Sequence, residues 1–179
     1  MSFGLAAAAV LWMNSSALAQ AQTPALAAPP AQPLAGGTPE AIPFDIPYGQ
    51  SVGLEKAKQV MAAAEADAKK RNWKMNIAIV DTNGELVMFQ RMEGAQIGSV
   101  NVSIGKARTA ARYRRESRVF YNQFETGHAY VGALDPGITA SPGGFPLVDG
   151  GKVVGAVGCS GGTGDQDAAI CKSGAEVLK

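Results

Sequence analysis

Apolar residues recur at helical spacing in two long segments of the chain. In residues 54–72 the repeating positions are Leu54, Ala57, Met61, Ala64 and Ala68, and in residues 97–112 they are Ile97, Val100, Ile104, Ala107 and Ala111. An apolar stripe on one side of a segment is typical of an amphipathic helix that packs on a core. Both segments are therefore predicted to be helices, and Ser51 is the expected N-cap of the first.

Four shorter segments carry the apolar and β-branched runs that are typical of strands. Residues 75–80 and 85–91 are separated by Thr82-Asn83-Gly84, and residues 145–148 and 152–159 by a pair of glycines. Strands joined by so short a turn run antiparallel, so each pair predicts a β-hairpin. Further helices are expected at residues 118–125 and 165–178, the latter capped by Asp165. The order of elements predicts an α/β fold with helices packed on an antiparallel sheet.

The first 46 residues differ in composition from the rest of the chain. Residues 1–19 hold an uncharged apolar run and end in small residues, which is typical of a signal peptide. They lack the usual basic residues, so a disordered alanine-rich leader is the alternative. The run is too short to span a membrane. Residues 20–46 are mainly Ala, Pro, Gln and Gly and predict a flexible tether. We expect one domain, residues 47–179, in a periplasmic or secreted protein without an integral membrane segment once mature.

Charge excludes one class of partner. The 16 Lys and Arg residues nearly balance the 15 Asp and Glu residues, which leaves a net charge of +1. So weak a global field offers no electrostatic basis for nucleic-acid binding. A ligand site, if present, must depend on local groups.

Two glycine-rich segments flank the second predicted hairpin. The first includes Gly143 and Gly144, and the second includes Ser160, Gly161 and Gly162 just before the last predicted helix. Exposed backbone N–H groups in such segments can hold a carboxylate or phosphate. The alternative is that Gly155 and Gly158 let a helix pack closely on the strand and that the remaining residues form turns. Their spacing matches no nucleotide-binding motif.

A run of basic residues offers a second candidate site. The basic residues of this run are Lys106, Arg108, Arg112, Arg114, Arg115 and Arg118. Arg108, Arg112 and Arg115 share a face of a helix that continues through them. Such a face can clamp carboxylates or phosphates. A solvated helix end or a subunit interface explains the same charges.

Cys159 and Cys171 are the two cysteines of the chain. An exported protein matures in an oxidising compartment, where two thiols at this spacing can form a disulfide. Two buried free cysteines are the favoured interpretation of the pattern. A cysteine nucleophile activated by His128 is a third reading.

Several motifs together resemble the GlcG/HbpS haem-binding family, which includes the C-terminal domain of PduO-type proteins. The similarity covers residues 47–179 and is carried by Ala78-Ile-Val-Asp, Gly84-Glu-Leu, Arg91-Met-Glu-Gly-Ala, Lys106-Ala-Arg-Thr-Ala, Gly143-Gly-Phe-Pro, Val154-Gly-Ala-Val-Gly-Cys-Ser-Gly-Gly and Asp165-Gln-Asp. The resemblance implies a profilin-like α/β domain with a five-stranded antiparallel sheet flanked by helices. It also implies a homo-oligomer and haem or a related tetrapyrrole as a small-molecule ligand.

Haem would be bound non-covalently, because the chain has no Cys-x-x-Cys-His attachment motif. His128 is the only histidine, so a multi-histidine metal site is excluded, and an axial contact to haem iron is one reading of it. A loop histidine with no ligand role is the other. Met92, Tyr121, Tyr130 and Lys106 are rival iron ligands.

Two other functions remain open. A cofactor-independent enzyme acting on a small hydroxy or oxo acid or an aromatic catabolite would use Arg91, Glu93, Lys106 and Asp167, in which a cation holds the substrate carboxylate while an acid moves a proton. A structural assembly domain is the third possibility. The resemblance favours a binding protein over an enzyme.

Overall fold

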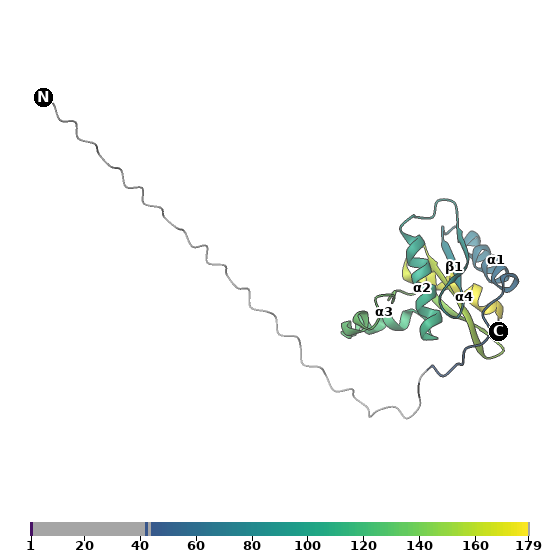
Figure 1. Cartoon of the computed structure of the whole chain (residues 1–179). Helices are drawn as coiled ribbons and strands as arrows, with labels where there is room; N and C mark the ends of the chain where they lie inside the picture. The colour runs from purple at the N-terminus through teal and green to yellow at the C-terminus, as the bar shows by residue number, and fades with distance from the viewer. Residues whose placement is uncertain (2–41, 43, 179) are drawn as a thin grey trace. The chain divides into compact units, whose positions relative to one another are not determined.

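The computed structural model describes Met1, Ile42 and residues 44–178, and the folded domain lies within residues 44–178 (Figure 1). The predicted signal peptide beyond Met1 and most of the predicted tether fall outside the described residues. Residues 44–46, which we assigned to the tether, contact the domain: Arg114 donates a hydrogen bond to the carbonyl of Ile46 over 2.9 Å. No helix in the described residues combines the length and apolar character needed to cross a bilayer.

The domain is built on one sheet in the order β2-β1-β4-β3, and every neighbouring pair is antiparallel. The strands are β1 (Asn76–Val80), β2 (Leu86–Arg91), β3 (Gly144–Asp149) and β4 (Lys152–Ser160). Both predicted hairpins, β1–β2 and β3–β4, are thus confirmed. The two central strands of the sheet, β1 and β4, pair with each other and bring the two hairpins into a single sheet.

The expected fifth strand is wrong for the described residues, which form four. Residues 47–52 run beside β4, but they make only one isolated bridge, between Tyr48 and Val153. They lie in the place that β1 leaves free beside β4, because β1 ends at Val80, opposite Ala156. Their pairing with β4 is too short to form a strand. Gly49 fills part of the gap by donating its N–H to the Val153 carbonyl over 2.8 Å. The profilin-like comparison stays a prediction.

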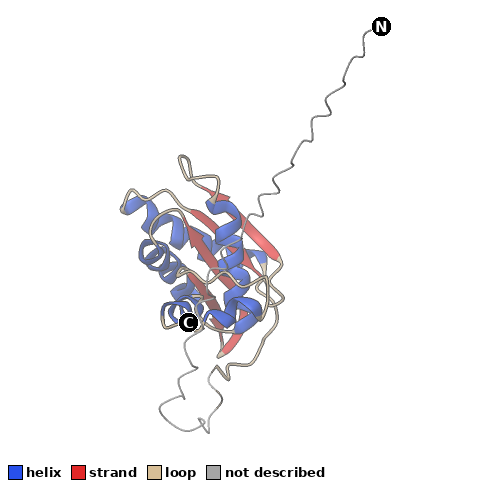
Figure 2. Cartoon of the chain, turned by 90° about the vertical axis from the view of Figure 1, so that its left-hand side faces the viewer, coloured by secondary structure: helices blue, strands red, loops and turns tan. Residues whose placement is uncertain are grey.

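Helices cover both faces of the sheet (Figure 2). Helices α1 (Leu54–Lys70) and α4 (Gly164–Ala175) share the larger apolar core, which includes Met61, Ile77 and Ile170. Helix α2 (Ser99–Tyr113) packs on the other face against small residues such as Ala78 and Ala156. The alternation of side chains along β1 sends Ile77 to one core and Ala78 to the other. Helix α3 (Arg118–Glu125) and the 3-10 turns η1 (Ala129–Ala133) and η2 (Glu176–Leu178) complete the domain.

Two predicted helix caps are wrong. The N-cap of α1 is Gly53, while the hydroxyl of Ser51 lies 2.9 Å from that of Thr82 instead. The N-cap of α4 is Thr163, not Asp165, and Thr163 forms a reciprocal capping box with Gln166. A Thr three residues before a Gln is the usual sequence signature of that box.

Candidate functional site

A buried ion pair lies where α2, β4 and α4 meet. Lys106, on α2, donates to Oδ2 of Asp167 over 2.6 Å and to the carbonyl of Cys159 over 3.2 Å. Oδ1 of Asp167 accepts the backbone N–H groups of Gly161 and Gly162 at 3.0 and 2.9 Å. Lys106 is 1% exposed and Asp167 2%. We expected these backbone donors to receive an external anion, and the chain itself supplies that anion through Asp167.

Burial dominates the electrostatics of this cluster. Desolvation lowers the pKa of Lys106, and the hydrogen bond and charge of Asp167 offset part of the effect. The paired charges and the two backbone donors satisfy the hydrogen-bonding capacity of the carboxylate. The cluster therefore anchors α2 and α4 to the end of β4, and its charged atoms are out of reach of a ligand.

Gly143 and Gly144 are packed closely against neighbouring residues and leave no room for a ligand at their Cα atoms. A Cβ atom at Gly144 would lie 2.2 Å from the carbonyl oxygen of Lys106, and one at Gly143 would lie 2.8 Å from Cβ of Asp167. Gly143 also has a φ of 119°, which side chains rarely adopt. Ser160 is 5% exposed and is likewise buried. Gly161 and Gly162 alone of the predicted glycine set line a cavity, of about 380 Å³.

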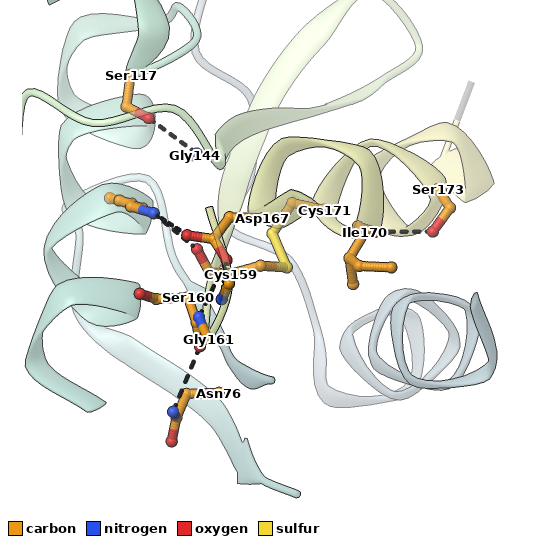
Figure 3. The surroundings of a disulfide bond; sticks show 12 residues. Asn76, Ser117, Gly144, Cys159, Ser160, Gly161, Asp167, Ile170, Cys171 and Ser173 are labelled. Atoms are coloured by element: carbon orange, nitrogen blue, oxygen red, sulfur yellow. Dashed lines mark hydrogen bonds and ion pairs between the residues drawn. A yellow bond between two sulfur atoms is a disulfide. The ribbon is translucent and has the colours of Figure 1, made fainter. Parts of the chain in front are cut away.

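The two cysteines form a disulfide, so the favoured expectation of free thiols is wrong (Figure 3). Cys159 ends β4 and Cys171 lies one turn beyond Asp167 on α4, with the two Cα atoms 5.5 Å apart. Both residues are fully buried. With no free thiol in the chain, the reading as a cysteine nucleophile activated by His128 is also wrong.

The predicted arginine face is divided by the end of α2. Arg108 and Arg112 donate to the carbonyls of Gly84 and Asn83, each over 2.9 Å, and thereby hold the tip of the β1–β2 hairpin. Helix α2 stops at Arg114, which has a left-handed φ of 53°. Arg115 therefore leaves the helix face on which the sequence placed it.

The residues of the enzyme hypothesis do not share one cavity. Arg91 and Glu93 line an open cavity of about 350 Å³ at the end of β2, together with Met92. Lys106 and Asp167 do not line it and are paired with each other below the surface. No single substrate position in the structure contacts all four of these residues, so they cannot act together in the expected proton transfer.

Two open cavities at α3 share Arg118 as a lining residue. The larger, about 460 Å³, is lined by Arg118 together with Phe44, Arg115, Glu116, Val119, Asn122 and Pro146. The smaller, about 190 Å³, is lined by Arg118 together with Tyr121, Ser141, Pro142, Gly164 and Asp165. The larger cavity combines apolar side chains with two guanidinium groups. This combination suits a ligand that is apolar in its body and acidic at its edge.

Arg115 is held in a cage of aromatic rings. Its guanidinium carbon lies 3.9 Å from the ring centre of Phe44, 5.2 Å from that of Phe120 and 5.9 Å from that of Tyr113. Desolvation lowers the pKa of Arg115, but its guanidinium group stays protonated at neutral pH. The rings fix a cation at the wall of the larger cavity. Nothing in the sequence indicated the cage, because Phe44 lay in the predicted tether.

Among the candidate iron ligands, only Tyr121 lines either α3 cavity. Its side chain is partly exposed and stands one helical turn from Arg118. His128 precedes η1, where its Nδ1 lies 3.1 Å from the hydroxyl oxygen of Thr126. Its ring centre is 6.2 Å from that of Tyr130, and both residues are exposed.

Comparisons with known proteins identify the family. The family model described as "Haem degrading protein HbpS-like" matches residues 52–176. Protein GlcG of Escherichia coli K12 is 40% identical over 107 residues, which cover 59% of this chain and 78% of GlcG. An uncharacterised 15.0 kDa protein of Citrobacter freundii, from the dhaT-dhaS intergenic region, is 32% identical over 126 residues, or 69% of this chain and 89% of that protein.

Solved structures agree with this assignment. A Streptomyces reticuli HbpS double mutant superposes with a TM-score of 0.67 at 27% identity, over 84% of this chain and 99% of HbpS. Klebsiella pneumoniae ORFY gives a TM-score of 0.68 at 26% identity, over 77% and 97%. PduOC, crystallised as a haem complex, shares the fold with a TM-score of 0.66 at 23% identity, over 72% and 96%. The resemblance inferred from the motifs is thereby confirmed, and the chain belongs to the HbpS-like family.

Proposed function

We propose that this protein binds haem non-covalently at α3, across the two cavities that share Arg118. Membership of a family described by haem chemistry supports the ligand class. PduOC supports the capacity of the same fold to hold haem. The observation that carries the proposed location is the placement of Arg115 and Arg118 beside an apolar floor.

The chemistry of these residues fits the shape of haem. Val119 and Pro146 offer apolar contact for the porphyrin face, whose burial is the main source of affinity. Arg115 and Arg118 can each bind a propionate through paired N–H donors. Tyr121 offers a phenolate oxygen, one of the ligands that proteins use for haem iron. Both cysteines are engaged in the disulfide, so neither is left for a covalent thioether link.

Titration of the purified protein with hemin tests the proposal. We expect a Soret band that saturates at a fixed stoichiometry. Arg118→Ala should weaken binding by roughly ten- to hundredfold, since a charge-assisted contact is worth about 1.5–3 kcal/mol. Arg112→Ala, which removes a cation bonded to the hairpin tip, is the matched control and should leave the affinity unchanged. A featureless, nonsaturating titration contradicts haem binding itself.

Tyrosine variants test the iron contact separately. Tyr121→Phe should shift the Soret and charge-transfer bands of the bound haem while the far-ultraviolet circular dichroism stays the same. Tyr130→Phe, which removes an exposed phenol outside both cavities, is the control. Identical spectra for the wild type and Tyr121→Phe would show that Tyr121 does not contact the iron. The proposed site would then depend on the arginine contacts, which the titration of Arg118→Ala tests.

We also propose that the protein is exported to the periplasm or beyond and assembles as a homo-oligomer. The apolar run in residues 1–19 and the Cys159–Cys171 disulfide support export, because disulfides persist in oxidising compartments. Cell fractionation with and without residues 2–19 tests the location. Sedimentation equilibrium of residues 42–179 tests assembly, and a mass equal to one chain at micromolar concentration would contradict it.

A further inference from the structure

Two ties fasten the first two turns of α4 to the end of β4. The first is the disulfide from Cys171 to Cys159. The second is Asp167, four residues earlier on the same helix face, which accepts the N–H groups of Gly161 and Gly162. Figure 3 shows the disulfide and Asp167 side by side between α4 and the strand. The segment between the two cysteines is therefore a closed loop with an internal anchor.

The same first turn of α4 forms a wall of the Tyr121 cavity. Gly164 and Asp165 line that cavity, and Asp165 Oδ1 lies 2.7 Å from a terminal nitrogen of Arg118. Gly164 packs against Pro142, where a Cβ atom would lie 3.0 Å from the proline ring. A displacement of this turn would move the wall and release Arg118 from Asp165. Cys171, Asp167 and Asp165 thus connect the disulfide to the cavity within two turns of one helix.

We propose that the disulfide is a redox-sensitive latch on the α3 cavity. The proposal rests on the proposed haem site. A dithiol reductant transfers two electrons and two protons to the Sγ–Sγ bond of Cys159 and Cys171, so that two thiols form while the dithiol closes to a disulfide. The start of α4 is then held by noncovalent contacts only, among them the bonds of Asp167 to Gly161, Gly162 and Lys106. Its opening becomes more frequent, and the wall at Gly164 and Asp165 is lost in the opened state.

Burial makes this coupling reciprocal. Cys159 and Cys171 are 0% exposed, so a reductant reaches the sulfur atoms only when the start of α4 opens. A ligand seated against Gly164 and Asp165 stabilises the closed form. Occupied protein must therefore resist reduction, and reduced protein must hold the ligand less tightly, as linkage requires.

The first measurement is the rate of disulfide reduction by dithiothreitol, with and without metal-free protoporphyrin IX. This porphyrin has the ring and propionates of haem but no iron for the thiols to ligate, and its fluorescence reports binding independently. At a free porphyrin concentration 100 times its Kd, the reduction rate should fall about 100-fold. At a free concentration equal to the Kd, the rate should be about half of that without porphyrin. Bound porphyrin with an unchanged reduction rate overturns the latch and leaves the proposed function standing.

The second measurement needs no porphyrin. Amide hydrogen exchange at Gly161 and Gly162 should accelerate up to about 100-fold on reduction, the scale expected for releasing a closed loop of this size. Amides of the β1–β2 hairpin serve as the internal control and should change far less. If porphyrin fails to bind, the proposed function falls, and faster exchange confined to Gly161 and Gly162 still supports a latch on α4. Unchanged or uniformly faster exchange overturns it.

Discussion

Gly158 lies so close beneath α2 that a Cβ atom at this position would be 2.1 Å from the carbonyl oxygen of Ser103. The contact is between backbone atoms of β4 and α2, which cannot yield as a flexible side chain would. Gly158→Ala is therefore expected to lower the free energy of unfolding by about 3 kcal/mol, at the upper end of the usual overpacking cost. Urea denaturation monitored by circular dichroism measures the change.

Gly98→Ala provides the matched control for this glycine. Gly98 precedes α2, has a φ of −57°, and a Cβ there would meet nothing within 4 Å. Its replacement should change the stability by less than about 0.5 kcal/mol. Equal losses at Gly158 and Gly98 would show that the close approach of α2 to β4 does not govern the result.

Lys106→Met is expected to be strongly destabilising. It leaves the buried carboxylate of Asp167 without its cation, a situation that typically costs about 3–5 kcal/mol. Adding Asp167→Asn should recover part of the loss, because the charge that lacked a partner is then gone. Lys56→Met removes an exposed partner of Asp149 and should cost less than about 1 kcal/mol. Additive losses for Lys106 and Asp167 in a double-mutant cycle would argue against their coupling.

The pH dependence of stability should reveal Lys106. Burial lowers its pKa below the ordinary value of 10.5, so the folded protein releases this proton at a lower pH than the unfolded chain does. Between the two pKa values the unfolded chain binds more protons, and Lys106 makes the free energy of unfolding rise with pH. The difference between wild type and Lys106→Met should therefore grow as the pH approaches 10.5. A flat difference curve would mean that folding leaves the pKa of Lys106 unchanged.

Thr163→Ala tests the observed start of α4. Loss of the Thr163 hydroxyl should cost about 1 kcal/mol, because the backbone N–H of Gln166 loses its partner. Ser51→Ala is the comparison, since the hydroxyl of Ser51 bonds to Thr82 instead of capping α1. Thermal unfolding of both variants distinguishes them. A larger loss of stability in Ser51→Ala than in Thr163→Ala would indicate that Ser51 caps α1, as the sequence predicted.

Local patterns predicted the hairpins well because turn and strand preferences act within a few residues. Gly84, with a φ of 87°, supplies the left-handed position that the β1–β2 turn needs. The five-stranded sheet was implied by the family resemblance and not by a local pattern, and residues 47–52 make too short a contact with β4 to supply the fifth strand. The end of α2 lies within one residue of the predicted end, but the expected arginine face extended beyond it to Arg115, because Arg114 is not a residue that usually adopts a left-handed φ.

Contacts between residues far apart in the sequence were the part of the candidate site that could not be predicted. The sequence correctly indicated that Gly161 and Gly162 offer N–H groups to an anion, but it could not show that Asp167 is that anion. Lys106 and Asp167 are 61 residues apart and meet only because α2 and α4 both reach the end of β4. The aromatic cage of Arg115 likewise joins Phe44 to α3, a contact that no local pattern encodes.

The strand order makes β2 and β3 the edge strands of the sheet, and the two edges differ in whether another strand can add to them. On β3, the outward backbone groups of Gly144 are bonded to Ser117, and Pro146 has no N–H to offer. Strand-to-strand association through that border is therefore blocked. The border at β2 has no proline, so any aggregation of partly unfolded chains by strand addition should begin there.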